Sequence, residues 1–97
     1  MKLTVTLKNN QLEFHEERTD PLHDSLLLSN GQCWTYSQYT KKGTGYEEFT
    51  PQSEMAKLLR KYKSPSLLQE LTRLALQGSR AARLAVQFLD QEDKNNS

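Results

Sequence analysis

The chain has 97 residues, a length that fits one domain. Thirteen Lys and Arg against twelve Asp and Glu give a net charge of +1, which excludes a strongly basic or strongly acidic protein. The longest apolar run, residues 26–28, is too short to cross a membrane, and the first residues show no apolar stretch of signal-peptide length. We therefore expect a protein that does not enter a membrane. One cysteine, Cys33, cannot form an internal disulfide, so we also expect a reducing, cytoplasmic location.

The first hairpin is predicted from residues 3–8, where apolar and polar side chains alternate as in a half-buried strand. Asn9 and Asn10 follow, and asparagine tolerates the positive φ that a two-residue hairpin turn requires. Pairing across this turn sets Leu7 opposite Leu12, with apolar side chains on one face and polar side chains on the other. The same register pairs Val5 with Phe14, Thr6 with Glu13 and Thr4 with His15.

A second hairpin is predicted around Asn30-Gly31, the strongest short turn signal in the chain. Its register sets Leu27 opposite Trp34 on one face, with Ser25 opposite Tyr36. Leu26, Leu28, Cys33 and Thr35 fall on the other face. Because helices can cover only one face of a small sheet, we expect the other to be buried by a second copy of the chain or by another partner.

A third turn is predicted at residues 41–45, which contain two lysines and two glycines between segments rich in tyrosine. Glycines favour turns and add mobility, so we expect a flexible loop that leaves Lys41 and Lys42 exposed.

Three amphipathic helices are predicted in the remainder. Thr50-Pro51 and Ser64-Pro65 each supply a capping hydroxyl followed by proline at the first helical position. Gly78 either ends or bends the second helix, and Ser79 can cap the third. Apolar residues recur at helical spacing in three stripes: Met55, Leu58, Leu59 and Tyr62; Leu67, Leu71, Leu74 and Ala75; Ala81, Leu84, Ala85, Phe88 and Leu89.

Strands followed by helices predict an α+β fold, with antiparallel β-hairpins in the N-terminal half packed against three C-terminal α-helices. We expect one domain over residues 1–90 and a flexible polar tail over residues 91–97.

Motifs for catalysis or cofactor binding do not stand out. His15, His23 and Cys33 lack the spacing of a zinc site. No G-x-S-x-G is present, and the glycines at 43 and 45 lack the third glycine and the helix start of a phosphate-binding loop. We therefore expect no enzyme, no metal and no cofactor.

Charge is distributed unevenly along the chain. Residues 41–83 hold nine Lys and Arg against four Glu, whereas the two ends of the chain are acidic. Such a stretch can meet phosphates or an acidic protein surface, and solvated helix faces explain it equally well. Residues 69–90 have the spacing of a helix-turn-helix, but polar side chains flank the turn glycine where that motif needs apolar ones, so we do not assign it. The candidate phosphate-binding residues are Arg60, Lys61, Arg73, Arg80 and Arg83.

Aromatic side chains gather in residues 34–49, beside the lysines of the third turn. They suit the core of a sheet, a protein interface or the stacking of single-stranded nucleic acid. The candidate partner-binding residues are Trp34, Tyr36, Tyr39, Lys41, Lys42 and Tyr46.

The function expected from these features is that of a small non-catalytic binding protein, a regulator or inhibitor of another protein acting through direct contact. The alternative is a nucleic-acid-binding module that uses the basic residues 41–83 and the aromatic residues 34–49. Salt separates the two, because phosphate binding falls steeply with ionic strength.

Overall fold

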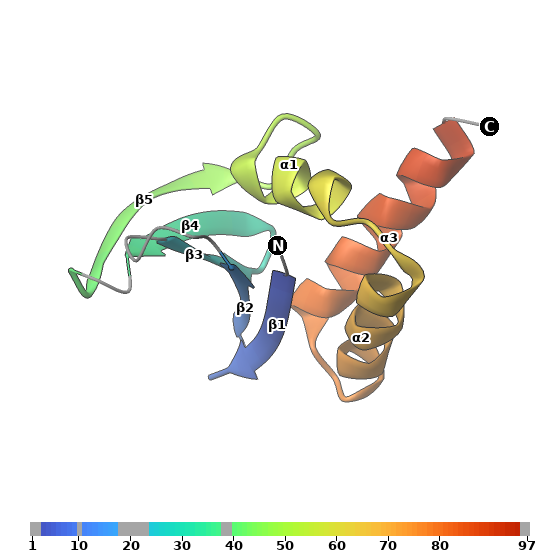
Figure 1. Cartoon of the computed structure of the whole chain (residues 1–97), viewed down its shortest axis with the longest axis horizontal. Helices are drawn as coiled ribbons and strands as arrows, with labels where there is room; N and C mark the ends of the chain where they lie inside the picture. Colours follow the sequence, from blue (N-terminus) through green and yellow to red (C-terminus); the bar gives the residue numbers. More distant parts are fainter. Residues whose placement is uncertain (1–2, 10, 18–23, 38–39, 96–97) are drawn as a thin grey trace.

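The computed structural model describes residues 3–9, 11–17, 24–37 and 40–95. It has the expected α+β fold, in which a sheet of antiparallel strands in chain order is followed by three helices (Figure 1). The strands are β1 (Leu3–Lys8), β2 (Gln11–Glu16), β3 (Asp24–Ser29), β4 (Gln32–Ser37) and β5 (Lys42–Glu48). The helices are α1 (Glu54–Lys61), α2 (Pro65–Leu76) and α3 (Arg80–Asn95).

Asparagines set the first two hairpins. Asn9 and Asn30 both have a φ of 52°, in the left-handed region that asparagine tolerates better than most residues. The predicted registers are confirmed, with Leu7 opposite Leu12 and Leu27 opposite Trp34. The remaining pairs expected across both turns are also present: Val5 with Phe14, Thr6 with Glu13, Thr4 with His15 and Ser25 with Tyr36.

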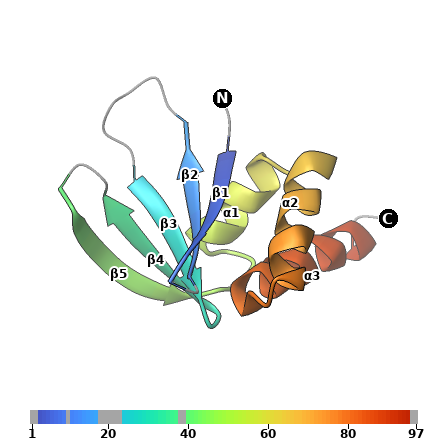
Figure 2. The ribbon, with the colours of Figure 1, turned by 90° about the horizontal axis from the view of Figure 1, so that it is seen from below.

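The two faces of the sheet meet different surroundings. Alternation along the strands sends Val5, Phe14 and Leu28 to the side where the helices lie. Figures 1 and 2 show all three helices on that side and none on the other. We call the helix-free side the open face.

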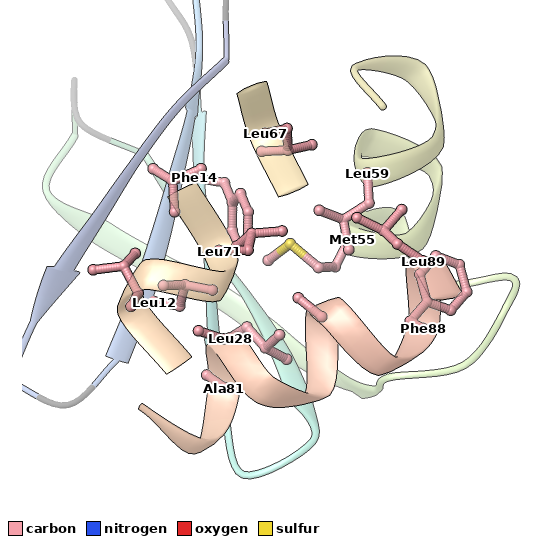
Figure 3. Close-up of a cluster of buried hydrophobic side chains, with 14 of the residues drawn as sticks. Leu12, Phe14, Leu28, Met55, Leu59, Leu67, Leu71, Ala81, Phe88 and Leu89 are labelled. Atoms are coloured by element: carbon pink, nitrogen blue, oxygen red, sulfur yellow. The ribbon is translucent and has the colours of Figure 1, made fainter. Parts of the chain in front are cut away.

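The core lies between the sheet and the helices, where side chains from all three helices meet those of β1–β4 (Figure 3). Leu71 of α2 lies at its centre and has no exposed surface, in keeping with the expectation for this helix. The other side chains labelled in Figure 3 are Leu12, Phe14, Leu28, Met55, Leu59, Leu67, Ala81, Phe88 and Leu89.

Serine hydroxyls cap all three helices. Ser53, Ser64 and Ser79 each accept a hydrogen bond from the backbone N–H three residues later, at 3.1–3.2 Å. The caps at Ser64 and Ser79 were expected, but the first helix was expected to begin at Thr50-Pro51. Those two residues instead form a turn in which Ser53 N–H donates to the Thr50 carbonyl, so the helix begins later.

The second helix ends at Gly78, as expected. Gly78 has a φ of +103°, and the N–H of Ser79 donates back to the Leu74 carbonyl at 3.2 Å, a glycine-terminated helix end. Within the described residues, no helix is long and apolar enough to span a membrane.

The third helix departs from expectation at its end. The sequence predicts a flexible tail from Gln91, whereas α3 remains helical to Asn95. Two acidic side chains of this last segment form ion pairs with α1 and with the connection between α1 and α2: Glu92 with Arg60, and Asp93 with Lys63. These pairs give the polar segment contacts that its composition alone does not reveal.

The predicted loop at residues 41–45 is also corrected. Lys41 N–H donates to the Ser37 carbonyl at 2.8 Å, and β5 already begins at Lys42, so residues 42–45 belong to a strand. A register shift between Trp34 and Tyr36 marks a bulge in this strand pair, and Gly45 there has a φ of +81°. Gly43 and Gly45 therefore belong to an edge strand that bends at the bulge, and not to a loop.

Replacing Leu71 by alanine should lower the free energy of unfolding by about 2–5 kcal/mol, because the side chain is fully buried and the cavity cannot close completely. Urea titration followed by circular dichroism measures the change. Leu76→Ala on the same helix is the matched control, because Leu76 is 85% exposed, and it should change stability little. A loss below about 1 kcal/mol for Leu71→Ala would contradict this placement of α2.

Candidate functional site on the open face

Three aromatic side chains lie together on the open face of β4 and β5, and we call them the aromatic cluster: Trp34, Tyr36 and Tyr46. The Trp34 ring is stacked against Tyr46, with centroids 6.0 Å apart and planes 17° apart. Tyr36, two residues further along β4, has its ring centroid 5.8 Å from that of Trp34. Tyr46 is 71% exposed, so the cluster offers a flat ring to solvent.

The position of Trp34 depends on Gly43 in the neighbouring strand. A Cβ atom added at Gly43 would lie 1.7 Å from Cζ2 of the indole, far inside contact distance. The indole therefore lies across the backbone of β5 in space that only glycine leaves free. This explains Gly43 better than loop mobility does.

Leu27 occupies the centre of the open face, opposite Trp34, and is only 7% exposed. This low exposure is reached within the single chain, so neighbouring residues of the chain itself cover most of this leucine. The expected reason for a second copy, an apolar Leu27 left open to water, is therefore absent, while Trp34 stays half-buried.

A hollow of about 330 Å³ lies beside the aromatic cluster, and we call it the lysine hollow. Lys8 reaches it from the end of β1, and Lys41 from the turn between β4 and β5. Neither ammonium group forms an ion pair with any described residue. The remaining lining residues are Asn9, Gln11, Glu13, Leu27, Trp34 and Tyr36.

A second hollow, of about 200 Å³, lies on the Tyr46 side of Trp34. Its lining is uncharged: Gln11, Leu27, Ser29, Asn30, Gln32, Trp34 and Tyr46. The open face therefore has cations at one end of the aromatic cluster and amides with hydroxyls at the other.

The backbone of Lys41 is strained. Its φ of 59° lies in the left-handed region, which costs a side-chain-bearing residue about 1–2 kcal/mol. Asn9 and Asn30 adopt the same conformation with a residue suited to it. Unlike those two turns, this one holds a lysine where asparagine or glycine would be favoured.

The two lysines singled out from the sequence separate in the structure. Lys42 pairs with Ser37, and strand alternation places that pair on the side opposite Trp34 and Tyr36. Lys42 is exposed but does not line the lysine hollow. Tyr39, the remaining candidate of the partner-binding set, lies outside the described residues.

The candidate phosphate-binding residues are not gathered into one patch. Arg60 donates to the Pro51 carbonyl at 2.6 Å and to Glu92 at 2.7 Å, with its guanidinium 5.3 Å from the centre of the Phe88 ring. Arg73 is paired with Glu70, whose pKa this pairing lowers. Both arginines are therefore neutralised by carboxylates of the helices.

Lys61 is held by a buried carboxylate. Glu16, at the end of β2, accepts hydrogen bonds from Lys61 Nζ at 2.8 Å and from the Tyr62 hydroxyl at 2.6 Å. The carboxylate raises the pKa of Tyr62, because the phenolate would lose that hydrogen bond, and it raises the pKa of Lys61 for the same reason. The sequence does not reveal this cluster, because Lys61 and Tyr62 lie 45 and 46 positions after Glu16 in the chain.

Arg80 and Arg83 differ from the other three candidates. Both are exposed at the start of α3, and neither forms an ion pair with a described residue. They belong to the helical layer on the far side of the sheet from the aromatic cluster (Figure 2). The free arginines and the free lysines therefore lie on different sides of the sheet.

A chain of polar groups crosses the open face beside the aromatic cluster. The Ser25 hydroxyl and Nδ1 of His15 are 2.9 Å apart, and Nε2 of His15 contacts the Glu13 carboxylate. With a proton on Nε2, the ring can donate to Glu13 while Nδ1 accepts from the Ser25 hydroxyl. Ser25 has no exposed surface, so its hydroxyl is not accessible to a substrate despite the serine–histidine–carboxylate arrangement.

The cysteine is buried under the helices at Cys33, and burial raises the pKa of its thiol. Among the described residues, no three or more His, Cys, Asp or Glu side chains are placed to hold a metal ion. No family model, curated protein or solved structure matches the chain.

Gly43→Ala should displace the indole of Trp34, because the added methyl group would overlap its ring. We expect a loss of about 1–3 kcal/mol in unfolding free energy and a red shift of tryptophan emission, which reports on Trp34 alone. Lys42→Ala, the neighbouring exposed position on β5, is the control and should change neither. Unchanged emission and stability in Gly43→Ala would show that the indole lies elsewhere.

Tyr62 should titrate above its ordinary pKa of about 10 because its hydroxyl donates to Glu16. A raised pKa in the folded state stabilises the fold below the unfolded-state pKa, and this contribution disappears as pH rises through the folded-state value. Phenolate absorbance followed with pH should show one late-titrating tyrosine that Tyr62→Phe removes. Identical late titration in the Tyr62→Phe variant would assign that phenol to another tyrosine.

Proposed function

We propose that the protein is a small non-catalytic binding protein that regulates or inhibits another protein through its open face. The supporting observation is the aromatic cluster, which projects an exposed Tyr46 ring from a sheet face that no helix covers. Tryptophan and tyrosine are enriched among the residues that carry most of the binding energy at protein interfaces.

Preorganisation supports the same proposal. Trp34 is half-buried between Tyr36, Tyr46 and the backbone at Gly43, so its ring loses little freedom when a partner binds. Leu27 is already covered by the chain, and the face therefore need not be permanently buried in an assembly.

The charges favour a protein partner over a nucleic acid. Arg60, Lys61 and Arg73 are engaged in ion pairs, and the free arginines lie away from the aromatic cluster. A phosphate backbone is bound best by a continuous positive track, which this arrangement does not supply.

The test is affinity capture with the full chain on beads, before and after nuclease treatment, with retained proteins identified by mass spectrometry. We expect at least one protein that survives nuclease, is lost with Tyr46→Ala and is kept by Leu76→Ala, an exposed leucine of α2. Tyr46 is exposed, so its replacement should leave the fold intact. Capture that nuclease abolishes, or that Tyr46→Ala does not alter, would contradict the proposal.

A further inference from the structure

The lysine hollow carries charge that the chain does not neutralise. Lys8 and Lys41 come from opposite ends of the sheet and line the same hollow, yet neither has an ion-pair partner among the described residues. Glu13 also lines it, but its carboxylate is engaged by His15. The hollow therefore combines two unpaired cations with a wall that includes Leu27 and the rings of Trp34 and Tyr36.

The hollow beneath α1 shows the contrast. It has a similar volume, about 320 Å³, and also contains lysines. There each lysine is matched within the chain: Lys57 with Glu54, and Lys61 with Glu16. In the lysine hollow, by contrast, neither lysine has an ion-pair partner among the described residues.

The backbone at Lys41 points the same way. Lys41 has a positive φ, whereas the turns of the first two hairpins have asparagine, Asn9 and Asn30, in the same conformation. A lysine there accepts conformational cost without packing into the core. Strain of this kind is commonly retained where a side chain serves binding.

We propose that the lysine hollow binds a carboxylate side chain from an extended acidic segment of a partner protein, held between Lys8 and Lys41. A neighbouring apolar side chain of that segment packs against Trp34 and Tyr36. This inference rests on the proposed function, because it specifies the chemistry of the partner that the open face would bind.

A carboxylate fits this site better than a run of phosphates. Glu13 lies in the hollow and Glu48 follows Tyr46 along β5, so carboxylates border the two lysines on this face. A single acidic side chain can meet the two lysines while the rest of the segment avoids these carboxylates. A polyphosphate chain along the face would be repelled at both places.

Random linear peptides displayed on phage, selected on the immobilised full chain at physiological salt, supply the probe. Selected sequences should be enriched in Asp or Glu beside an aromatic or aliphatic residue. The strongest binder is then synthesised together with a version carrying the amide in place of its acid. Lack of any binder, or binders without acidic enrichment, would overturn the inference.

Lys41→Asn is the decisive variant, because asparagine accepts the positive φ and should keep or raise the melting temperature. It should weaken the acidic peptide about two- to fivefold, while Lys42→Ala, on the other side of the sheet, should not. The amide peptide should bind the unmodified chain more weakly and show no further loss with Lys41→Asn. Equal effects of Lys41→Asn on both peptides would overturn the carboxylate assignment.

The outcomes separate this inference from the proposed function. Peptides whose affinity depends on Tyr46, but changes neither with Lys41→Asn nor with removal of their acid, would support the proposed protein-binding face. They would overturn the carboxylate site. Displacement of the peptide by a single-stranded oligothymidylate that binds more tightly and loses affinity steeply with salt would overturn both.

Discussion

The left-handed backbone at Asn9 and Asn30 is the constraint on which the rest of the structure depends. Each asparagine closes a two-residue turn, and each turn fixes the register of its strand pair. Because side chains alternate along a strand, a slip of one residue would move every core side chain to solvent. The two turns therefore decide which residues meet the helices and which form the open face.

On the open face, the fit between Trp34 and Gly43 has the corresponding role. The glycine lets the indole lie across β5, where it stacks with Tyr46. The bulge near Gly45 bends this edge strand, a feature that also discourages edge-to-edge pairing with other chains. The proposed binding therefore uses the face of the sheet, where the aromatic rings and the lysines lie.

Local patterns were sufficient to predict both hairpin registers and the existence of three helices, because turn residues and apolar periodicity act over a few positions. Features that depend on distant partners were not predicted. Arg60 was a phosphate candidate, but Glu92, 32 positions away, pairs with it. Sequence patterns do not distinguish Lys41 from Lys42, since only the observed register shows that they belong to different sides of the sheet. The glycines near them were assigned to a loop because the indole that requires Gly43 cannot be seen locally.

The central claim is that the open face is already organised for binding in the free protein. Nuclear Overhauser contacts in solution test this most directly, between the indole protons of Trp34 and both the Gly43 α-protons and the Tyr46 ring. The structure predicts strong contacts to both groups in the protein alone. An indole that shows neither contact, with Leu27 exposed, would contradict a preformed binding face.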